Sequence, residues 1–468
     1  MKTKFTKMQK IIMRRYRSIG ILLFCAVMAI GGIVGCMFFF RPKVSEMEKR
    51  KLTEFPQFTI SSFMDGSYFS EVSLWFSDTY PMRDTLVKAD QKVKGLYGIE
   101  SKTMMVGEQA EADDIPDVSK EQPTESTTEE ASKKPEKDTT EQSSDKTTEE
   151  VTTEAVVKQV DPPDAKVMDE EFQKQVQQNL YVKDGSAFSV YYFVQDSATK
   201  YINALNRAAK ELEGQTDVYC VLIPNQSGAL LSEKELDSLG GSNQMQAIDY
   251  YYGMLEGVKT VDTIRTLREH NDEYIYFRTD HHWTQLGAFY VYDNFCKTKG
   301  ISTIPLESRK KYTFENFLGT FYSTLNSAEM AANPDTVYAY IPNGTNDMKY
   351  WDEDGTEHDW NVVSDVTGWA ESSLYMTFIA GDRPLEIIEN PKITDGSSCL
   401  VLKESYGNAF VPLLVDHYQT VYVMDYRYAQ VNVLDYVRDK QIDDLILINN
   451  ITIIGSESVA NTIDGLLQ

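Results

Sequence analysis

One uncharged run near the N-terminus limits what this chain can be more than any other feature. Residues 18–40 contain no charged side chain, and an apolar run of this length can cross a bilayer as a helix. Seven lysines and arginines precede the run and five follow it closely, a bias that favours a cytoplasmic N-terminus. No later segment is apolar enough to cross back. We therefore expect a single span in the cell membrane, with everything from Arg41 onward outside the cytoplasm.

Two other interpretations of this run fit less well. A cleaved signal peptide has a shorter apolar core and a small-residue cleavage site, and neither feature occurs here. Ile33-Val34-Gly35-Cys36 resembles the cleavage site of a lipoprotein, but the chain stays apolar through Phe40. The sequence favours an uncleaved anchor at 18–40 behind a basic cytoplasmic tail at 1–17.

Residues 107–165 differ from the rest of the chain in composition. This stretch holds 18 acidic residues against 6 lysines, nearly half of the formal net charge of −25. Such a composition cannot bury enough apolar surface to fold, so we predict a disordered acidic tether. Strand-like segments flank it at 103–106 and 179–182, which indicates an insertion between neighbouring strands.

The main domain is predicted to run from residue 166 to residue 468, with a membrane-proximal stalk at 41–106 joined to it. In this domain, segments of helical periodicity alternate with short continuous apolar runs, which are typical of strands buried on both faces. Four such runs stand out: 218–223, 399–402, 421–424 and 445–448. Alternating strands and helices predict an α/β fold with a parallel sheet covered on both faces. Ligand sites in such folds lie beyond the carboxyl ends of the strands.

Charge and cysteine content exclude several classes of function. The strong acidity argues against a nucleic-acid partner, since phosphate binding needs clustered lysine and arginine. The cysteines are widely spaced and form no CxxC pair, so neither a disulfide framework nor a structural zinc site is expected. We predict that all of them are unpaired, buried thiols: Cys25, Cys36, Cys220, Cys296 and Cys399.

Asp280 and His282 are the residues from which a reaction can be predicted. They lie between a short predicted strand at 274–277 and a predicted helix at 284–299. A serine nucleophile needs an imidazole that takes its proton and a carboxylate that orients the imidazole. Asp280 can hold one ring nitrogen of His282 and leave the other facing a serine.

Ser405 is the candidate nucleophile. It follows the apolar strand at 399–402, at a sharp turn into a predicted helix. Backbone N–H groups at the start of a helix lack intrahelical partners and attract negative charge, so they could form part of an oxyanion hole. Gly407 would let an acyl carbonyl approach closely, because it has no Cβ.

Other roles stay open for these residues. Ser405 and Asp280 can each cap a helix, and paired histidines are often structural. A metal site would need further ligands. The candidate for one is His358, between Glu357 and Asp359, but it lies in a polar stretch typical of a surface loop. We therefore predict no metal and no cofactor.

The segment Thr279-Asp280-His281-His282-Trp283-Thr284 resembles the signature of the DHHW family of bacterial surface proteins. That family is similar to the SGNH-like domains of alginate O-acetyltransferases, in which an Asp-x-His-Trp motif precedes a later serine. Here Asp280, His282 and Trp283 match the motif, and Ser405 matches the serine. The resemblance implies a circularly permuted SGNH-hydrolase-like fold, with a parallel sheet flanked by helices.

Near the serine the chain departs from this pattern, because it has Lys403-Glu404-Ser405 where the acetyltransferases carry Gly-Asp-Ser. Arg427 could contact substrate or an oxyanion, or it could pair with Asp425. Asn449 and Asn450 end the last buried strand, and one of them could supply an oxyanion donor. Aromatic side chains near the motifs would suit sugar stacking and core packing equally well, among them Trp283 and Tyr406.

The resemblance implies an extracytoplasmic O-acetyltransferase that modifies a cell-surface or secreted polysaccharide. Ser405 would carry the acetyl group, His282 would act as base and then as acid, and Asp280 would orient His282. Because acetyl donors are made inside the cell, a membrane-embedded acyltransferase would deliver the group. Two alternatives stay open: a carbohydrate esterase with the same triad, and a non-catalytic scaffold that binds polysaccharide or an assembly partner.

Overall fold

The computed structural model describes residues 179–468 without a gap, together with 103–107, 109–117, 174, 176–177 and scattered positions between 41 and 85. Contacts divide the chain into two compact units. The larger one contains all of the candidate site residues and comprises 102–317, 335–369 and 374–468. The smaller one comprises the residues up to 101 together with 318–334 and 370–373.

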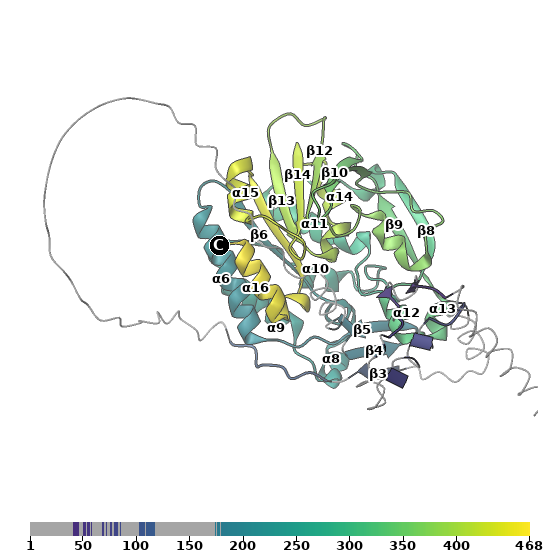
Figure 1. Cartoon of the computed structure of the whole chain (residues 1–468). Coiled ribbons are helices and arrows are strands. Elements are labelled where there is room, and N and C mark those ends of the chain that lie inside the picture. Colours follow the sequence, from purple (N-terminus) through teal and green to yellow (C-terminus); the bar gives the residue numbers. More distant parts are fainter. Residues whose placement is uncertain are drawn as a thin grey trace, which may run out of the picture. The chain divides into compact units, whose positions relative to one another are not determined.

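The larger unit is built on an eight-stranded sheet (Figure 1). Five neighbouring strands run parallel. Their spatial order is β14 (Thr420–Asp425), β13 (Ser398–Lys403), β15 (Asp444–Asn450), β6 (Asp217–Ile223) and β7 (Lys259–Thr260). β13 and β15 are buried along their whole length, which explains their nearly continuous apolar sequences. All four predicted buried strands are present.

The other edge of the sheet is antiparallel, so the sheet is mixed, whereas the sequence predicted a parallel sheet. Next to β14 come β12 (Leu385–Glu389), β10 (Asp347–Trp351) and β11 (Glu357–Asn361). Buried and exposed residues alternate along β10, as expected for a strand with one solvated face. Such segments lack the continuous apolar run that reveals a buried strand in the sequence. The fold is therefore α/β with a mixed sheet.

Helices cover both faces of the sheet. On one face, α6 (Gln195–Glu211) and α16 (Glu457–Leu466) lie side by side, joined by hydrogen bonds from Lys200 and Arg207 to α16 (Figure 1). On the other, α11 (Gln285–Lys299) shares one apolar core with Val221, Val401 and Ile448. Other helices of this unit are α7 (Gln226–Leu230), α8 (Glu233–Leu239), α9 (Gln244–Gly253), α10 (Ile264–Glu269), α14 (Val411–Leu414) and α15 (Val433–Lys440).

Small sheets lie outside the main one. The predicted strands that flank the acidic stretch pair with each other, since β3 (Thr103–Gly107) is antiparallel to β4 (Asn179–Lys183). β4 also pairs with β5 (Ser186–Ser189), and β8 (Lys311–Phe317) pairs with β9 (Asp335–Tyr340). The smaller unit contains β1 (Val44–Ser45), β2 (Arg50–Lys51), α12 (Thr320–Leu325) and α13 (Ala328–Ala332).

Residues 109–117, which the sequence assigned to the tether, contact the folded unit. The Asp113 N–H donates to the Phe193 carbonyl at 2.9 Å. The Asp113 carboxylate accepts from the N–H of Gln195, the first residue of α6, at 2.8 Å. A helix N-terminus presents unpaired donors and favours negative charge, so this acidic segment is held where α6 begins.

No helix in the described part of the chain is long and apolar enough to cross a bilayer. The predicted span at 18–40, the lipoprotein-like Cys36 and most of the predicted stalk lie outside the described residues. Within them, three cysteines are buried and form no disulfide, as predicted: Cys220, Cys296 and Cys399.

Candidate active site

A tight loop brings Asp280 against His282. The predicted strand at 274–277 is reduced to a single antiparallel bridge from Tyr276 to Trp283. The chain reverses between these two residues, so the acidic and basic side chains of the motif lie on one short turn. α11 begins directly afterwards, at Gln285.

Two polar side chains outside the motif hold this loop. The buried Asp335 carboxylate accepts from the N–H and from the hydroxyl of Thr279, both at 2.7 Å. Gln226 of α7 donates to the Asp280 carbonyl at 2.9 Å. Sequence reasoning missed both residues, because each lies more than fifty positions from the motif in the sequence and belongs to no recognisable pattern. They act on the backbone of the loop and so position it.

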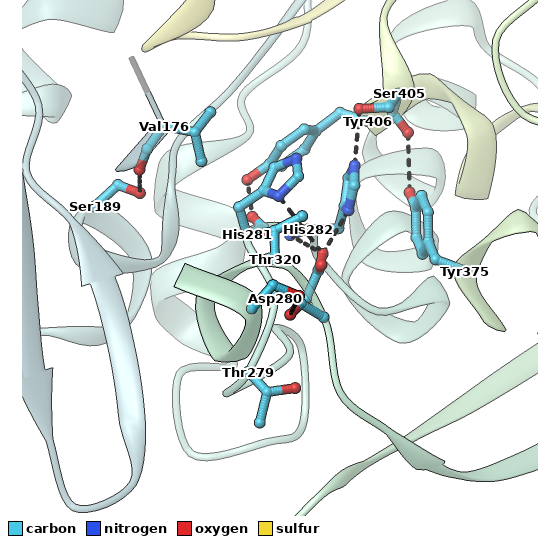
Figure 2. A network of polar contacts seen from close by, with 12 residues as sticks. Val176, Ser189, Thr279, Asp280, His281, His282, Thr320, Tyr375, Ser405 and Tyr406 are labelled. Carbon is cyan, nitrogen blue, oxygen red and sulfur yellow. Dashed lines mark hydrogen bonds and ion pairs between the residues drawn. The ribbon is translucent and has the colours of Figure 1, made fainter. Parts of the chain in front are cut away.

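Asp280, His282 and Ser405 form a continuous line of hydrogen bonds (Figure 2). His282 Nδ1 lies 2.5 Å from Asp280 Oδ1, and His282 Nε2 lies 2.8 Å from Ser405 Oγ. The same Asp280 oxygen accepts from the His282 N–H at 3.0 Å, which orients the carboxylate. In this geometry an imidazole can take the serine proton while the carboxylate stabilises the resulting imidazolium.

These three side chains lie at the carboxyl edge of the parallel strands, where ligands bind in such folds. Ser405 follows the end of β13. Ser405 and His282 are each 7% exposed and Asp280 is 1% exposed. Low exposure strengthens the interaction between the Asp280 carboxylate and the His282 ring, because little water screens it.

Glu404 shapes the turn that carries Ser405, the 3-10 turn η4 (Ser405–Ala409). The buried Glu404 carboxylate accepts from the Tyr406 N–H at 2.9 Å and from the Asn450 N–H at 2.8 Å. Burial raises the pKa of Glu404, and these two donors oppose the rise. Glu404 thus ties the serine turn to the end of β15.

Two backbone donors of the serine turn are engaged within the protein. The Tyr406 N–H binds the Glu404 carboxylate, and the Gly407 N–H donates to the Glu404 carbonyl at 2.8 Å. A Cβ built on Gly407 would lie 2.6 Å from the Cβ of Lys403. Glycine is therefore needed here because the Lys403 side chain passes close to this position.

We expect Gly407→Ala to destabilise the protein by about 1–3 kcal/mol, the usual cost of overpacking. The added methyl would also lie 2.9 Å from Lys403 Cγ and 3.2 Å from Ile448 Cγ2, so the turn and the strand must separate. Urea unfolding measures the change. Gly465→Ala in α16 is the control, because nothing lies within 4 Å of its Cβ position. Equal losses of stability in both variants would contradict the packing role.

Trp283 and Tyr406 are buried and join the histidine loop to the serine turn. The Trp283 Nε1 donates to the Tyr406 carbonyl at 2.9 Å. In return the Tyr406 hydroxyl donates to the His281 carbonyl (Figure 2). The sequence was compatible with sugar stacking and with core packing for these two side chains. Core packing fits both, since Trp283 is completely inaccessible and Tyr406 is 1% exposed.

Asp280, His281 and His282 also carry donor atoms of the kinds that bind metal ions, one from each residue and all within 4.8 Å of one another. In the arrangement described above, the two ring nitrogens of His282 contact Asp280 and Ser405, as proton transfer requires. His358 lies elsewhere, on β11, where it pairs with Asp352 at 2.8 Å.

Arg427 is held in a buried ion cluster. Its Nη2 lies 2.7 Å from Asp425 Oδ2 and 2.8 Å from Asp382 Oδ2. The sequence left two roles open for Arg427, contact with substrate or an oxyanion and pairing with Asp425. The structure shows the pairing with Asp425. Lys403 completes the cluster, because its Nζ donates to Asp382 at 3.0 Å and to Asp425 at 3.3 Å. Burial opposes ionisation, yet the two cations hold the pKa of Asp382 well below its usual range.

Glu386 on β12 adds a fifth ionisable group to this region. It is completely buried, and neither of its carboxylate oxygens has a hydrogen-bond partner in the described part of the chain. Burial raises the pKa of Glu386 well above its ordinary value, although Lys403 opposes the rise. The folded protein therefore keeps a proton that the unfolded chain loses above about pH 4.5. The stability that protonated Glu386 contributes is fully present below about pH 4.5. It is lost as the pH rises toward the folded-state pKa of Glu386.

Glu386→Gln is expected to remove this pH dependence. Relative to the wild type, the variant should gain up to about 1.4 kcal/mol of stability for each pH unit above about pH 4.5, until the pH reaches the raised folded-state pKa of Glu386. Urea unfolding at several pH values measures the difference. Glu389→Gln, an exposed position on the same strand, is the control and should show no trend. A difference between Glu386→Gln and wild type that stays constant with pH would refute the buried proton.

Asn449 and Asn450 point to opposite faces of the sheet, because side chains alternate along a strand. The Asn449 side chain accepts from the Tyr201 hydroxyl of α6 at 3.0 Å. Asn450 shares its face with Ile448, which belongs to the core that also contains Tyr406. The side-chain nitrogens of Asn449 and Asn450 are both buried, and neither has a hydrogen-bond partner among the described residues. Asn449 therefore faces α6, and Asn450 lies on the opposite face, with Ile448.

Tyr375, in the 3-10 turn η3 (Glu371–Thr377), also reaches the site, and sequence reasoning missed it. Its ring stacks on the His282 imidazole, and its hydroxyl bonds to the Ser405 carbonyl (Figure 2). No motif surrounds Tyr375, and the chain has 28 tyrosines, so residue type alone could not have identified it.

The family model described as DHHW protein matches residues 48–424. That match spans most of the chain and includes Asp280, His282 and Ser405. The chain belongs to the DHHW protein family. Among curated protein sequences, none matches it significantly.

Solved structures similar to this DHHW protein include a family member from Eubacterium siraeum, at 28% identity and a TM-score of 0.55, over 61% of this chain and 94% of that one. PatB1 of Bacillus cereus has the same fold, at 21% identity and a TM-score of 0.51, over 60% of this chain and 98% of its own. The O-acetyltransferase domain of Pseudomonas putida AlgJ matches at 12% identity and a TM-score of 0.33, over 60% of this chain and 96% of that domain.

Proposed function

We propose that this DHHW protein is an O-acyltransferase of the acetyltransferase kind, with Ser405 as its nucleophile. The observation that carries the proposal is the line from Asp280 through His282 to Ser405, with separations of 2.5 and 2.8 Å. A serine hydroxyl is a weak nucleophile and needs an adjacent base of this kind. The acetyl group follows from the resemblance of the histidine motif to that of SGNH-like O-acetyltransferases.

The proposed reaction has two half-reactions that use the same groups. First, Ser405 Oγ attacks the acyl carbonyl of the donor while His282 Nε2 takes the hydroxyl proton. The tetrahedral intermediate collapses, and the leaving group departs with that proton, which leaves acyl-Ser405. Then an acceptor hydroxyl attacks the acyl group and gives its proton to His282, which returns it to Ser405 Oγ as the ester bond breaks. Asp280 holds His282 in the tautomer that makes both transfers possible.

Asn450 is the side chain that we assign to the oxyanion. A tetrahedral intermediate places negative charge on the former carbonyl oxygen, and a preorganised donor stabilises that charge. The Asn450 side-chain nitrogen is a buried donor that the described residues leave unused. Its own backbone N–H binds Glu404, next to Ser405.

The acceptor in this proposal is a hydroxyl of a cell-surface or secreted polysaccharide. A membrane-embedded acyltransferase delivers the acetyl group, because acetyl donors are made inside the cell. The anchor at 18–40, with a cytoplasmic N-terminus and an extracytoplasmic main domain, belongs to the same proposal and rests on the sequence.

The test separates transfer from hydrolysis. The full-length chain, purified in detergent, is incubated with p-nitrophenyl acetate and a panel of oligosaccharides, and the products are analysed by mass spectrometry. Acetylated oligosaccharide supports transfer. Free acetate alone, even at saturating acceptor, would instead identify an esterase with the same triad. A folded protein that forms neither product would be the non-catalytic scaffold.

A further inference from the structure

One segment outside the sequence motifs contacts both the base and the nucleophile. We name residues 374–382 the Tyr375 arm. The Tyr375 ring stacks on the His282 imidazole, with ring centroids 4.0 Å apart and an interplanar angle of 12°. The Tyr375 hydroxyl donates to the Ser405 carbonyl at 3.0 Å (Figure 2). One side chain thus touches the face of the base and the backbone of the nucleophile.

Tyr375 is itself firmly held. It is 5% exposed, and its ring meets Phe277 and Phe378 edge-on, with centroids 6.1 and 5.3 Å away. Burial raises the pKa of Tyr375 well above its usual value, so the hydroxyl stays protonated and can donate. The ring cannot leave His282 without opening this packing.

The far end of the Tyr375 arm is bound to the serine turn. Asp382 accepts from Lys403 at 3.0 Å and from Asn408 at 3.1 Å, and Asn408 lies in η4, the turn that begins with Ser405. The Gly381 carbonyl accepts from the same Lys403 ammonium at 3.1 Å. Both ends of the arm therefore contact the short segment that carries the nucleophile.

The backbone between the two ends of the arm is strained. Ile379, Ala380 and Gly381 have φ angles of 43°, 57° and 87°. Side chains with a Cβ avoid this region, and β-branched residues avoid it most strongly. Such conformations persist only where surrounding contacts dictate them, and they cluster at functional sites. Here the contacts at Asp382 on one side and the packing of Tyr375 on the other hold the strained residues in place.

We propose that Tyr375 is a positioning residue that keeps His282 Nε2 aligned on Ser405 Oγ, and that Lys403 anchors the Tyr375 arm through Asp382. This inference rests on the proposed function, because it assigns a role in the same acylation step. Without the ring, His282 keeps its bond to Asp280 but can tilt out of line with the serine. Proton transfer needs the base within hydrogen-bond reach, and small misplacements of reacting groups cost up to about a hundredfold in rate.

The experiment measures acylation of the full-length chain by p-nitrophenyl acetate in a stopped-flow instrument. Tyr375→Leu should lower the acylation rate constant by about tenfold to a hundredfold without changing KM. Tyr375→Phe keeps the stacked ring and should stay within about threefold of wild type, since it loses a single hydrogen bond. Asp382→Asn should slow acylation by about tenfold. Tyr338→Leu, at an exposed tyrosine of β9, is the control and should match the wild type.

Two results would overturn the inference: a wild-type rate for Tyr375→Leu, or equal slowing in Tyr375→Phe and Tyr375→Leu. If Tyr375→Leu fails to fold, Asp382→Asn decides, and a wild-type rate in that variant contradicts the anchoring. Failure of the proposed function is distinguishable, because it would appear in the wild type. A wild-type chain with no acylation burst and no adduct of phenylmethylsulfonyl fluoride on Ser405 would overturn the function, and the inference with it.

Discussion

Replacing Ser405 by alanine is expected to lower the rate of acyl transfer by at least about a thousandfold. The change removes the atom that would carry the acyl group, while it leaves the Tyr406 N–H bond to Glu404 and the Tyr375 bond to the Ser405 carbonyl in place. Binding of the acceptor should therefore change little. Transfer is measured as acetylated oligosaccharide formed per minute, and folding is checked by the melting temperature.

The control for this prediction is Ser197→Ala. Ser197 is another buried serine of the larger unit, on α6, and its hydroxyl has no hydrogen-bond partner among the described residues. We expect full activity in that variant. His282→Gln should resemble Ser405→Ala, because triad members act as a unit. Full activity of Ser405→Ala in a folded protein would refute the covalent mechanism.

Lys403→Met is expected to destabilise the protein by about 3–5 kcal/mol, the usual effect of removing one partner from a buried ion pair. Lys403 is completely buried, and its ammonium faces Asp382 and Asp425, so its loss leaves two carboxylates with the single charge of Arg427. In a domain of this size the melting temperature should fall by roughly 6–20 °C. Differential scanning calorimetry measures the shift.

Lys297→Met provides the control for that variant. Lys297 lies on α11, is 68% exposed on its side chain and pairs with Asp293 at the surface. Exposed pairs contribute little to stability, so the melting temperature should stay nearly constant. The double variant Lys403→Met with Asp382→Asn should recover part of the lost stability, because it removes one of the uncompensated charges. Equal melting temperatures for Lys403→Met and Lys297→Met would show that the cluster does not hold the site.

The pair Asp280–His282 could be predicted from the sequence because the two residues are neighbours on one short loop. Ser405 could be predicted because a buried strand followed by a turn marks the carboxyl edge of a parallel sheet. Both arguments use local sequence only. The distance between His282 and Ser405 depends on how residues more than a hundred positions apart come together, and only the structure gives it.

The remaining features of the site depend on contacts that local sequence does not contain. Lys403 stands out in the sequence as a departure from glycine, yet its partner Asp382 lies on a loop without a motif. The choice between Asn449 and Asn450 depends on a one-residue register, since neighbouring side chains of a strand face opposite ways. The antiparallel edge was not predicted, because β10, β11 and β12 lack the continuous apolar run that marks a strand buried on both faces.

Rapid-quench mass spectrometry of the acyl-enzyme tests the central claim most directly. The full-length chain is mixed with p-nitrophenyl acetate, quenched in acid within milliseconds to seconds, and digested, and the acetylated peptide is located. We predict one acetyl group on Ser405, which disappears as an added oligosaccharide becomes acetylated at the same rate. Acetylated oligosaccharide formed without acetyl-Ser405, or an acetyl group carried on another residue, would contradict the account.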